Sequence, residues 1–195
     1  MLFITWLWTF RWLRILYRNI KFDVPDKALY YFSRLNITYD NIWFLEDDVF
    51  FYNEQVIINI DSQYTNNEIL TNNYYENNDG HTNNWHWKTI HNITPINLDP
   101  PYYCCMICAV RLSKQILLFF DEYAINNKTI FFIEAFFPTI AIKNNLTYNI
   151  PIELSCITFN KIFDINIINK SYIYHPLKDL NQHVLIRKLL DNQLH

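Results

Sequence analysis

The chain of 195 residues has the length of one domain, and its 51% of hydrophobic residues can form a sizeable core. Its formal net charge of −3 argues against a nucleic-acid-binding protein with a broad basic face, because such proteins need clustered Lys and Arg. The single glycine, Gly80, excludes the glycine-rich Walker A and G-x-G-x-x-G loops that bind nucleotide phosphates.

The first 22 residues are apolar and basic, and we treat them as a segment separate from a domain at residues 23–195. The initial apolar run is too short to span a bilayer as a helix, which takes ~20 residues. Basic residues then recur at three- and four-residue spacing: Arg11, Arg14, Arg18 and Lys21. One hypothesis is therefore an amphipathic helix that makes peripheral membrane contact through residues 1–22. The alternatives are a degenerate gene start and, for the first ten residues, a strand.

The remaining elements follow from hydrophobic spacing. Helical spacing predicts helices at residues 25–36, 56–64, 114–126, 134–142 and 180–191, with Ser113 as an N-cap. Continuous apolar runs predict strands at residues 42–45 and 102–110, a strand end at 130–133, and short strands near Ile152, Ile157 and Ile173. Residues 65–84 are rich in Asn and predict a long loop. Strands that alternate with helices predict an α/β fold with a mainly parallel sheet flanked by helices.

Three adjacent carboxylates, Glu46, Asp47 and Asp48, directly follow the predicted buried strand at 42–45. The carboxyl ends of strands in such sheets carry the ligand site. Oxygen-rich clusters suit Mg²⁺ or Mn²⁺, and a cation would relieve the repulsion between the carboxylates. The apolar flanks on both sides argue against the alternative, an exposed acidic turn.

The cysteines allow two interpretations. Cys105 and Cys108 form a C-x-x-C, a spacing found in zinc and redox sites. Cys104 is adjacent, and only Cys156 could complete a four-cysteine site. Structural zinc sites usually show two paired spacings, so buried thiols on an apolar strand are the favoured interpretation.

Residues 26–32, followed by residues 39–50 with the sequence Tyr-Asp-Asn-Ile-Trp-Phe-Leu-Glu-Asp-Asp-Val-Phe, resemble nucleotide-sugar-dependent glycosyltransferases of the GT-A type. In those enzymes a strand ends in an acidic D-x-D-like motif that holds a divalent metal on the donor diphosphate. Arg111-Leu112-Ser113, the Glu134 region and Tyr174-His175-Pro176 also resemble parts of that family. The resemblance covers roughly residues 24–190, and it implies a GT-A-like domain that is N-terminally truncated, without its nucleoside-binding unit.

The resemblance also implies roles for individual residues. Glu46, Asp47, Asp48 and the late His175 would bind Mn²⁺ or Mg²⁺, with Asp48 the most direct ligand, so we expect Asp48 and His175 to lie within roughly 3–5 Å of each other. Glu134 would be the catalytic base, facing the same cleft. The donor would contact Asp26, Arg111 and Lys178, and the substrate would stack on Trp85 and Trp87.

Each of these residues also has a purely structural alternative. Glu134 could cap a helix N-terminus, where the helix dipole favours a carboxylate. His175 could be a surface turn residue, Arg111 and Lys178 could pair with surface carboxylates, and the two tryptophans could pack a loop onto the core.

The sequence therefore predicts a metal-dependent glycosyltransferase that moves a sugar from a nucleotide-diphosphosugar donor to a glycan or other hydroxyl acceptor. The alternative is a non-catalytic glycan- or protein-binding remnant of the same fold. Nucleic acid is not an expected partner. Sequons such as Asn36-Ile-Thr are weak evidence for the secretory pathway in so Asn-rich a chain, and a viral or cytoplasmic setting stays open.

Overall fold

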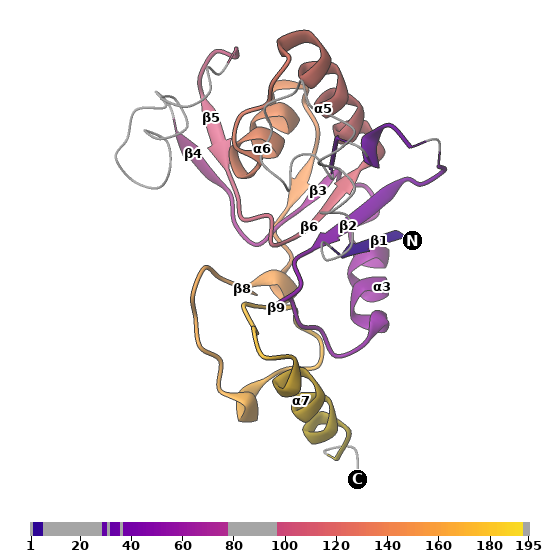
Figure 1. Cartoon of the computed structure of the whole chain (residues 1–195), viewed down its shortest axis with the longest axis vertical. Helices are drawn as coiled ribbons and strands as arrows, with labels where there is room; N and C mark the ends of the chain where they lie inside the picture. Colours follow the sequence, from indigo (N-terminus) through magenta and orange to yellow (C-terminus); the bar gives the residue numbers. More distant parts are fainter. Residues whose placement is uncertain (1, 6–28, 31, 36, 78–96, 193–195) are drawn as a thin grey trace.

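Figure 1 shows the computed structural model, which describes residues 2–5, 29–30, 32–35, 37–77 and 97–192. Strands and helices are mixed along this part of the chain but do not alternate strictly. The strands are β1 (Leu2–Thr5), β2 (Asn41–Leu45), β3 (Ile69–Leu70), β4 (Tyr75–Asn77), β5 (Tyr102–Cys104), β6 (Ala109–Ser113), β7 (Tyr148–Asn149), β8 (Cys156–Ile157) and β9 (Tyr174–His175). The helices are α3 (Glu54–Gln63), α5 (Lys114–Asn127), α6 (Ile133–Lys143) and α7 (Leu180–Asn192), with 3₁₀ turns η1 (Ile152–Leu154) and η2 (Ile165–Ile167).

The main sheet has five strands in the order β1-β2-β6-β3-β7. The β1–β2 and β3–β7 pairs are parallel, whereas β6 is antiparallel to both of its neighbours, β2 and β3. Four strands thus point one way and β6 runs against them. The expectation of a mainly parallel sheet is corrected to a mixed sheet, and the α/β class holds.

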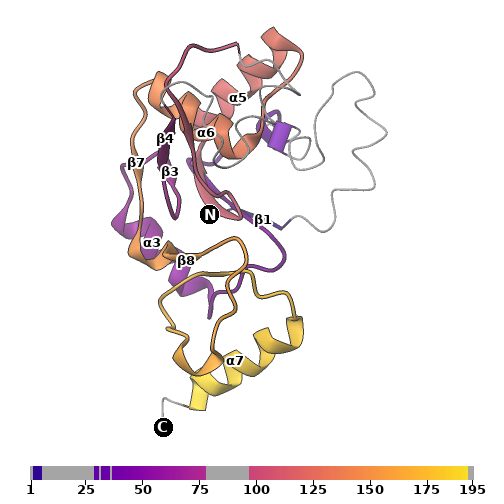
Figure 2. The same cartoon turned by 90° about the vertical axis from the view of Figure 1, so that its left-hand side faces the viewer.

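Alternating residues of β2 face opposite sides of this sheet, as the two-residue period of a strand requires. Ile42 and Phe44 pack into one core cluster with buried side chains of α5 and α6, and Trp43 and Leu45 pack into a second with α3. Both faces of the sheet are therefore covered by helices. Figure 2 shows α5 and α6 together on one side of the strands, with α3 away from them.

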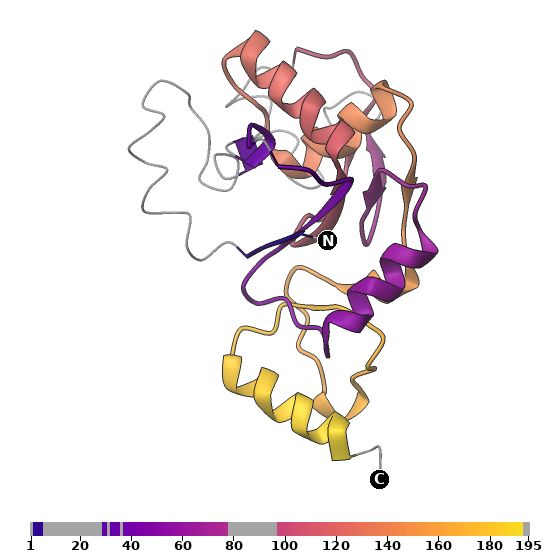
Figure 3. The same ribbon diagram turned by 90° about the vertical axis from the view of Figure 1, so that its right-hand side faces the viewer.

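The chain from η1 (Ile152–Leu154) to α7 forms a separate layer below the sheet. The parallel pair β8–β9 lies between the sheet and α7 in Figures 1 and 3. A third core cluster holds α7 in place through Ile186 and Leu190, which pack with Phe50 and Tyr174. Arg187 also donates hydrogen bonds from Nη2 to the carbonyl of Phe51 and from Nε to that of Tyr52, at 3.0 and 3.1 Å. This layer carries β9, and with it His175, to the end of β2.

Several predicted elements are confirmed. β2 and the helices α3, α5, α6 and α7 match their predicted ranges within three residues, and β8 and β9 lie at the short strands expected near Ile157 and Ile173. The hydroxyl of Ser113 accepts a hydrogen bond from the backbone N–H of Ile116 at 3.3 Å, so the predicted N-cap of α5 is also confirmed. Residues 29, 30, 32 and 33 are helical inside the predicted helix at 25–36, whose first residues lie outside the described part.

Other elements differ from the prediction. The apolar run at 102–110 is two strands, β5 and β6, separated by a loop at Cys105–Cys108. The region predicted as a loop contains β3 and β4, residues near Ile152 form η1, and α6 begins at Ile133 with no strand before it. β1 belongs to the main sheet, so at least this part of residues 1–22 is not a separate segment. The predicted amphipathic helix around Arg11–Lys21 lies outside the described residues.

Candidate metal centre and its cavity

The acidic triplet begins where β2 ends. Glu46 continues the pairing with the β6 side, since its backbone N–H donates to the carbonyl of Cys108 at 2.8 Å. A turn follows, in which the N–H of Val49 bonds back to the carbonyl of Glu46 at 3.2 Å. Glu46 and Asp48 line a cavity of about 970 Å³, whereas Asp47 is exposed and is not among the residues that line it. The expected role of Asp47 as a metal ligand is therefore corrected, because the turn directs its side chain to solvent.

His175 reaches the same place from the other end of the chain. Phe50 and Tyr174 exchange two backbone hydrogen bonds, of 2.9 and 2.8 Å, and the N–H of Leu177 donates to the carbonyl of Asp48 at 2.8 Å. These bonds hold residues 48–50 against residues 174–177. The imidazole Nε2 of His175 consequently lies 3.2 Å from Oδ1 of Asp48 and 3.1 Å from Oε2 of Glu46. The predicted closeness of Asp48 and His175 is confirmed, and so is their place on one cavity.

The hydrogen bonds of His175 define which nitrogen faces the carboxylates. Nδ1 lies 2.7 Å from the carbonyl oxygen of Thr158. A carbonyl only accepts hydrogen bonds, so Nδ1 must carry a proton and donate it. Nε2 is then the atom directed at Glu46 and Asp48. Metal-binding histidines are usually oriented in this way, with the second nitrogen donating to a backbone carbonyl.

A buried carboxylate oxygen of Asp48 that lacks a hydrogen-bond partner in the described part of the chain also favours a bound cation at this centre. Oδ1 of Asp48 is buried, and among the described residues it has no hydrogen-bond partner, although Nε2 is close. The single Nε2 proton of a charged imidazole is directed to Glu46, which leaves Asp48 with electrostatic attraction only. A buried carboxylate oxygen without a partner costs free energy. A cation beside Nε2 and Glu46 would offset the negative charge of both carboxylates, although Asp48 lies outside the compact group of ligand atoms at this centre.

Without a metal, Glu46 and His175 form an ion pair. The hydrogen bond from His175 lowers the pKa of Glu46, although burial opposes this shift. Burial lowers the pKa of His175, but the hydrogen bond to Glu46, the bond to Thr158 and the charge of Asp48 outweigh it and raise that pKa. The centre of two carboxylates and one imidazole thus keeps negative charge even when His175 is protonated, which favours a bound cation.

Cys108 is the residue of this centre that the sequence prediction missed. One ligand atom each from Glu46, Cys108 and His175 lie within 4.8 Å of one another, and no other such group of His, Cys, Asp and Glu occurs in the described part of the chain. The register explains the position: Leu45 pairs with Ala109, so Glu46 lies opposite Cys108. The C-x-x-C spacing drew attention to this thiol, but only the antiparallel direction of β6 places it beside Glu46.

The other cysteines match the buried-thiol interpretation. All four are free thiols, and Cys104 and Cys105 are buried beside Cys108 around the cavity. Burial raises the pKa of Cys104 to about 12, so this thiol stays neutral at physiological pH. Cys156 lies on β8 and packs against the third core cluster. The four-cysteine zinc site that the sequence left open is therefore not formed.

Glu134 lines the same cavity from the first turn of α6. Its own burial raises the pKa of its carboxyl group to about 7, while a hydrogen bond from the backbone N–H of Ile107 and the nearby His175 lower it. The same carboxylate is affected by the charge of Glu46, which shows that the two groups share one environment. The expectation that Glu134 faces the cleft of Asp48 and His175 is confirmed, and its role as a base stays a prediction.

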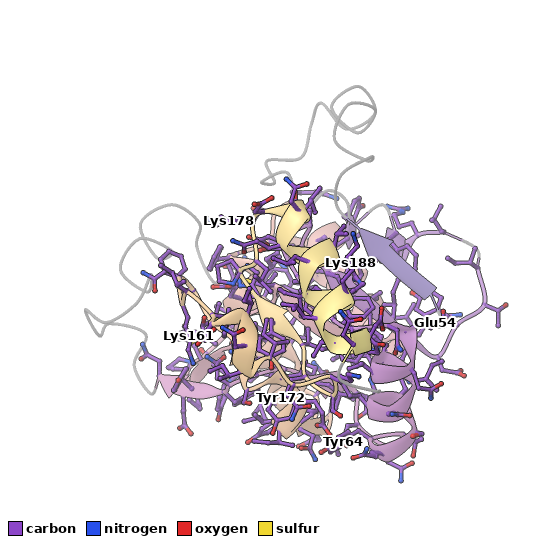
Figure 4. The ribbon with its side chains drawn as sticks, turned by 90° about the horizontal axis from the view of Figure 1, so that it is seen from below. Glu54, Tyr64, Lys161, Tyr172, Lys178 and Lys188 are labelled. Atoms are coloured by element: carbon purple, nitrogen blue, oxygen red, sulfur yellow. The ribbon has the colours of Figure 1, made fainter. Side chains whose placement is uncertain are left out.

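The expected donor contacts have different outcomes. Lys178 is exposed and lines the cavity beside Pro176; Figure 4 shows it next to the start of α7, apart from Lys161. Arg111 is only 1% exposed and is not among the cavity-lining residues. Its guanidinium binds Asp61 at 3.0 Å and two backbone carbonyls, because the face of β6 that carries Arg111 is directed at α3. The expected diphosphate contact of Arg111 is therefore corrected to a structural ion pair.

Asp26, Trp85 and Trp87 lie outside the described residues. Three other aromatic side chains line the cavity instead: Tyr75, Phe132 and Phe159. Tyr75 and Phe159 are 61% and 80% exposed, values unusual for large apolar rings. Asn73 and Asn77 add amide groups to the same wall. The cavity thus combines exposed rings, amides and carboxylates.

Comparison with known proteins gives no family for this chain: no known protein family matches it, and no curated protein matches its sequence. Among the described residues, no helix combines the length and the apolar character needed to cross a membrane.

Proposed function

We propose that this chain is a metal-dependent glycosyltransferase of the GT-A type, which moves a sugar from a nucleotide-diphosphosugar donor to a hydroxyl acceptor. The observation that carries the proposal is the convergence of Glu46, Asp48 and His175 on a cavity that also holds Glu134. His175 lies 127 positions after Asp48 in the sequence. Nothing local in the sequence requires these four side chains to meet. The acidic strand end and the late histidine are two of the features on which the family resemblance depends.

A divalent cation held by Glu46, Asp48 and His175 would neutralise the charge that develops on the leaving diphosphate. The chain's own residues prepare the rest of the reaction. Thr158 orients His175 through Nδ1, and the backbone bond from Leu177 to Asp48 fixes the two ligand segments relative to each other. Lys178, exposed at the cavity wall, supplies a positive charge in reach of the same space.

Glu134 is the proposed base of an inverting transfer. A base acts most effectively when its pKa lies near the working pH, and burial raises that of Glu134 to about 7. Its carboxylate would accept the proton of the acceptor hydroxyl as that oxygen attacks the sugar. The hydrogen bond from Ile107 holds the carboxylate in place for this transfer.

The test is a donor-hydrolysis and transfer screen with the full chain, a panel of nucleotide sugars, and Mn²⁺, Mg²⁺ or Zn²⁺. We expect metal-dependent release of the nucleoside diphosphate. Glu134→Gln should lower kcat by about 100-fold or more, as expected for the loss of a general base. The matched control is Glu122→Gln on α5, whose carboxylate is not among the cavity-lining residues, and it should keep full activity. A folded wild-type sample that turns over no nucleotide sugar with any of these metals would contradict the proposal.

A second candidate function is a non-catalytic carbohydrate-binding protein. The exposed rings of Tyr75 and Phe159 on the cavity wall favour it, since sugar rings stack on aromatic faces and amide groups bind their hydroxyls. Glycan-array binding without turnover, lost in Tyr75→Ala, would favour this function over transfer.

A further inference from the structure

Three groups around Nε2 of His175 differ in chemistry: a carboxylate of Glu46, a carboxylate of Asp48 and the thiol of Cys108. Mg²⁺ prefers oxygen ligands, whereas thiolates select softer ions such as Zn²⁺. An all-oxygen centre and a centre with a sulfur ligand therefore bind different metals. The position of Cys108 decides between them.

The thiol is held in the centre by its neighbours on both sides. Its backbone carbonyl accepts the N–H of Glu46 at 2.8 Å, so the strand pairing that positions Glu46 also positions Cys108. The thiol donates a hydrogen bond to the carboxylate of Glu46 in the metal-free state. Its residue is 6% exposed and lines the cavity, so Cys108 is buried from bulk solvent but open to a ligand in the cavity.

We propose that Cys108 is a metal ligand together with Glu46 and His175, and that this centre binds Zn²⁺ in preference to Mg²⁺ and Mn²⁺. Three donors, one oxygen, one nitrogen and one sulfur, would leave the fourth position of a tetrahedral Zn²⁺ open to a ligand in the cavity. The ion displaces the proton that the thiol shares with Glu46, since a coordinating thiol is deprotonated outright. This inference rests on the proposed metal centre and changes the metal expected there from Mn²⁺ or Mg²⁺ to Zn²⁺.

Cys104 provides a matched control within the same protein. It lines the same cavity and is equally buried, at 5%, but it is not part of the group within 4.8 Å. Replacing either thiol by Ser changes one atom in a similar environment. Only the Cys108 variant should alter metal binding.

The experiment titrates the full chain with Co²⁺, a spectroscopic substitute for Zn²⁺, and measures Zn²⁺ and Mn²⁺ affinities by competition. We expect a sulfur-to-cobalt charge-transfer band in the wild type and in Cys104→Ser, and its loss in Cys108→Ser. Removing the ligand should weaken Zn²⁺ binding by at least about 100-fold, the upper range for loss of a supporting residue. The ratio of Zn²⁺ to Mn²⁺ affinity should fall in the same variant, because oxygen and nitrogen ligands remain.

The outcomes separate this inference from the function it rests on. If wild-type protein binds Co²⁺ without a charge-transfer band, or if the band is lost in Cys104→Ser instead, Cys108 is not a ligand and the metal centre of the proposed function stands. If folded wild-type protein binds none of these ions, both fail. If Cys108→Ser does not fold, the wild-type spectrum shows whether a sulfur binds the ion, and the Cys104→Ser spectrum shows whether that sulfur belongs to Cys104.

Discussion

Glu134 lies in the first turn of a helix, yet the pKa of its carboxyl group is raised. The first turn of a helix stabilises a carboxylate through the dipole, so capping alone would keep its pKa low. Burial instead raises the pKa to about 7, against an ordinary value of 4.5. The site thus disfavours the charge that the helix position favours. The raised pKa supports the proposed role of Glu134 as a base that exchanges protons near neutral pH.

This conflict makes the stability of the protein depend on pH. Below about pH 4.5 Glu134 is protonated in both the folded and unfolded states. As pH rises toward 7 the unfolded state loses the proton first, so the folded state binds more protons and its stability falls. The loss amounts to about 3 kcal/mol at most. Urea unfolding at pH 5 and pH 8 should show Glu134→Gln less sensitive to pH than the wild type. An equal pH dependence in both proteins would contradict the raised pKa.

At the level of secondary structure, long periodic segments could be predicted and short paired ones could not. The helical spacing of Val56, Ile57 and Ile60 predicted α3, because a ten-residue amphipathic helix shows a periodic pattern of apolar residues in its own sequence. β3 and β4 have two and three residues in an Asn-rich stretch, and they exist only through pairing with distant strands. The run at 102–110 has no polar interruption, so its division by the Cys105–Cys108 loop has no signal in the sequence.

Arg111 joins two of these elements, β6 and the end of α3. Its guanidinium binds Asp61 and the carbonyls of Tyr64 and Asn67, and Trp43 donates to the same Asp61 at 3.0 Å. Arg111→Met removes the charged partner of Asp61, which keeps the bond from Trp43, and removes one donor each from the carbonyls of Tyr64 and Asn67. We expect a loss of about 3 kcal/mol or more in the free energy of unfolding, measured by urea denaturation.

Arg34→Met is the comparison for this variant. Arg34 is 45% exposed and its Nε lies 3.9 Å from Asp121, so the ion pair is weak and screened by solvent. Its loss should cost less than about 1 kcal/mol. Similar losses in the two variants would contradict a special structural role of Arg111, and diphosphate binding lost only in Arg111→Met would restore the donor contact expected from the sequence.

Over the whole molecule, the candidate centre depends on contacts between residues distant in sequence. The acidic strand end, Glu134 and His175 were found from the sequence because each has a local context: an apolar run before it, a helix start or a proline after it. Cys108 was not found as a ligand, because its place follows from the reversed direction of β6. The cavity walls at Tyr75 and Phe159 depend on β4 and on the loop after β8, neither of which has a periodic pattern.

Metal binding should stabilise the whole fold, because the ligands come from β2, the loop before β6, and β9, and these meet only in the native state. An ion that binds the folded state at about 100 times its Kd contributes about 2.7 kcal/mol. For a protein of this size the Tm should rise by roughly 5–10 °C. His175→Gln should abolish the shift. The control is His183→Gln: His183 is equally buried but hydrogen-bonds to the carbonyl of Leu177 at 2.7 Å and is not among the cavity-lining residues. This variant should start from a lower Tm and keep the full shift, whereas a shift that survives in His175→Gln would place the bound ion elsewhere.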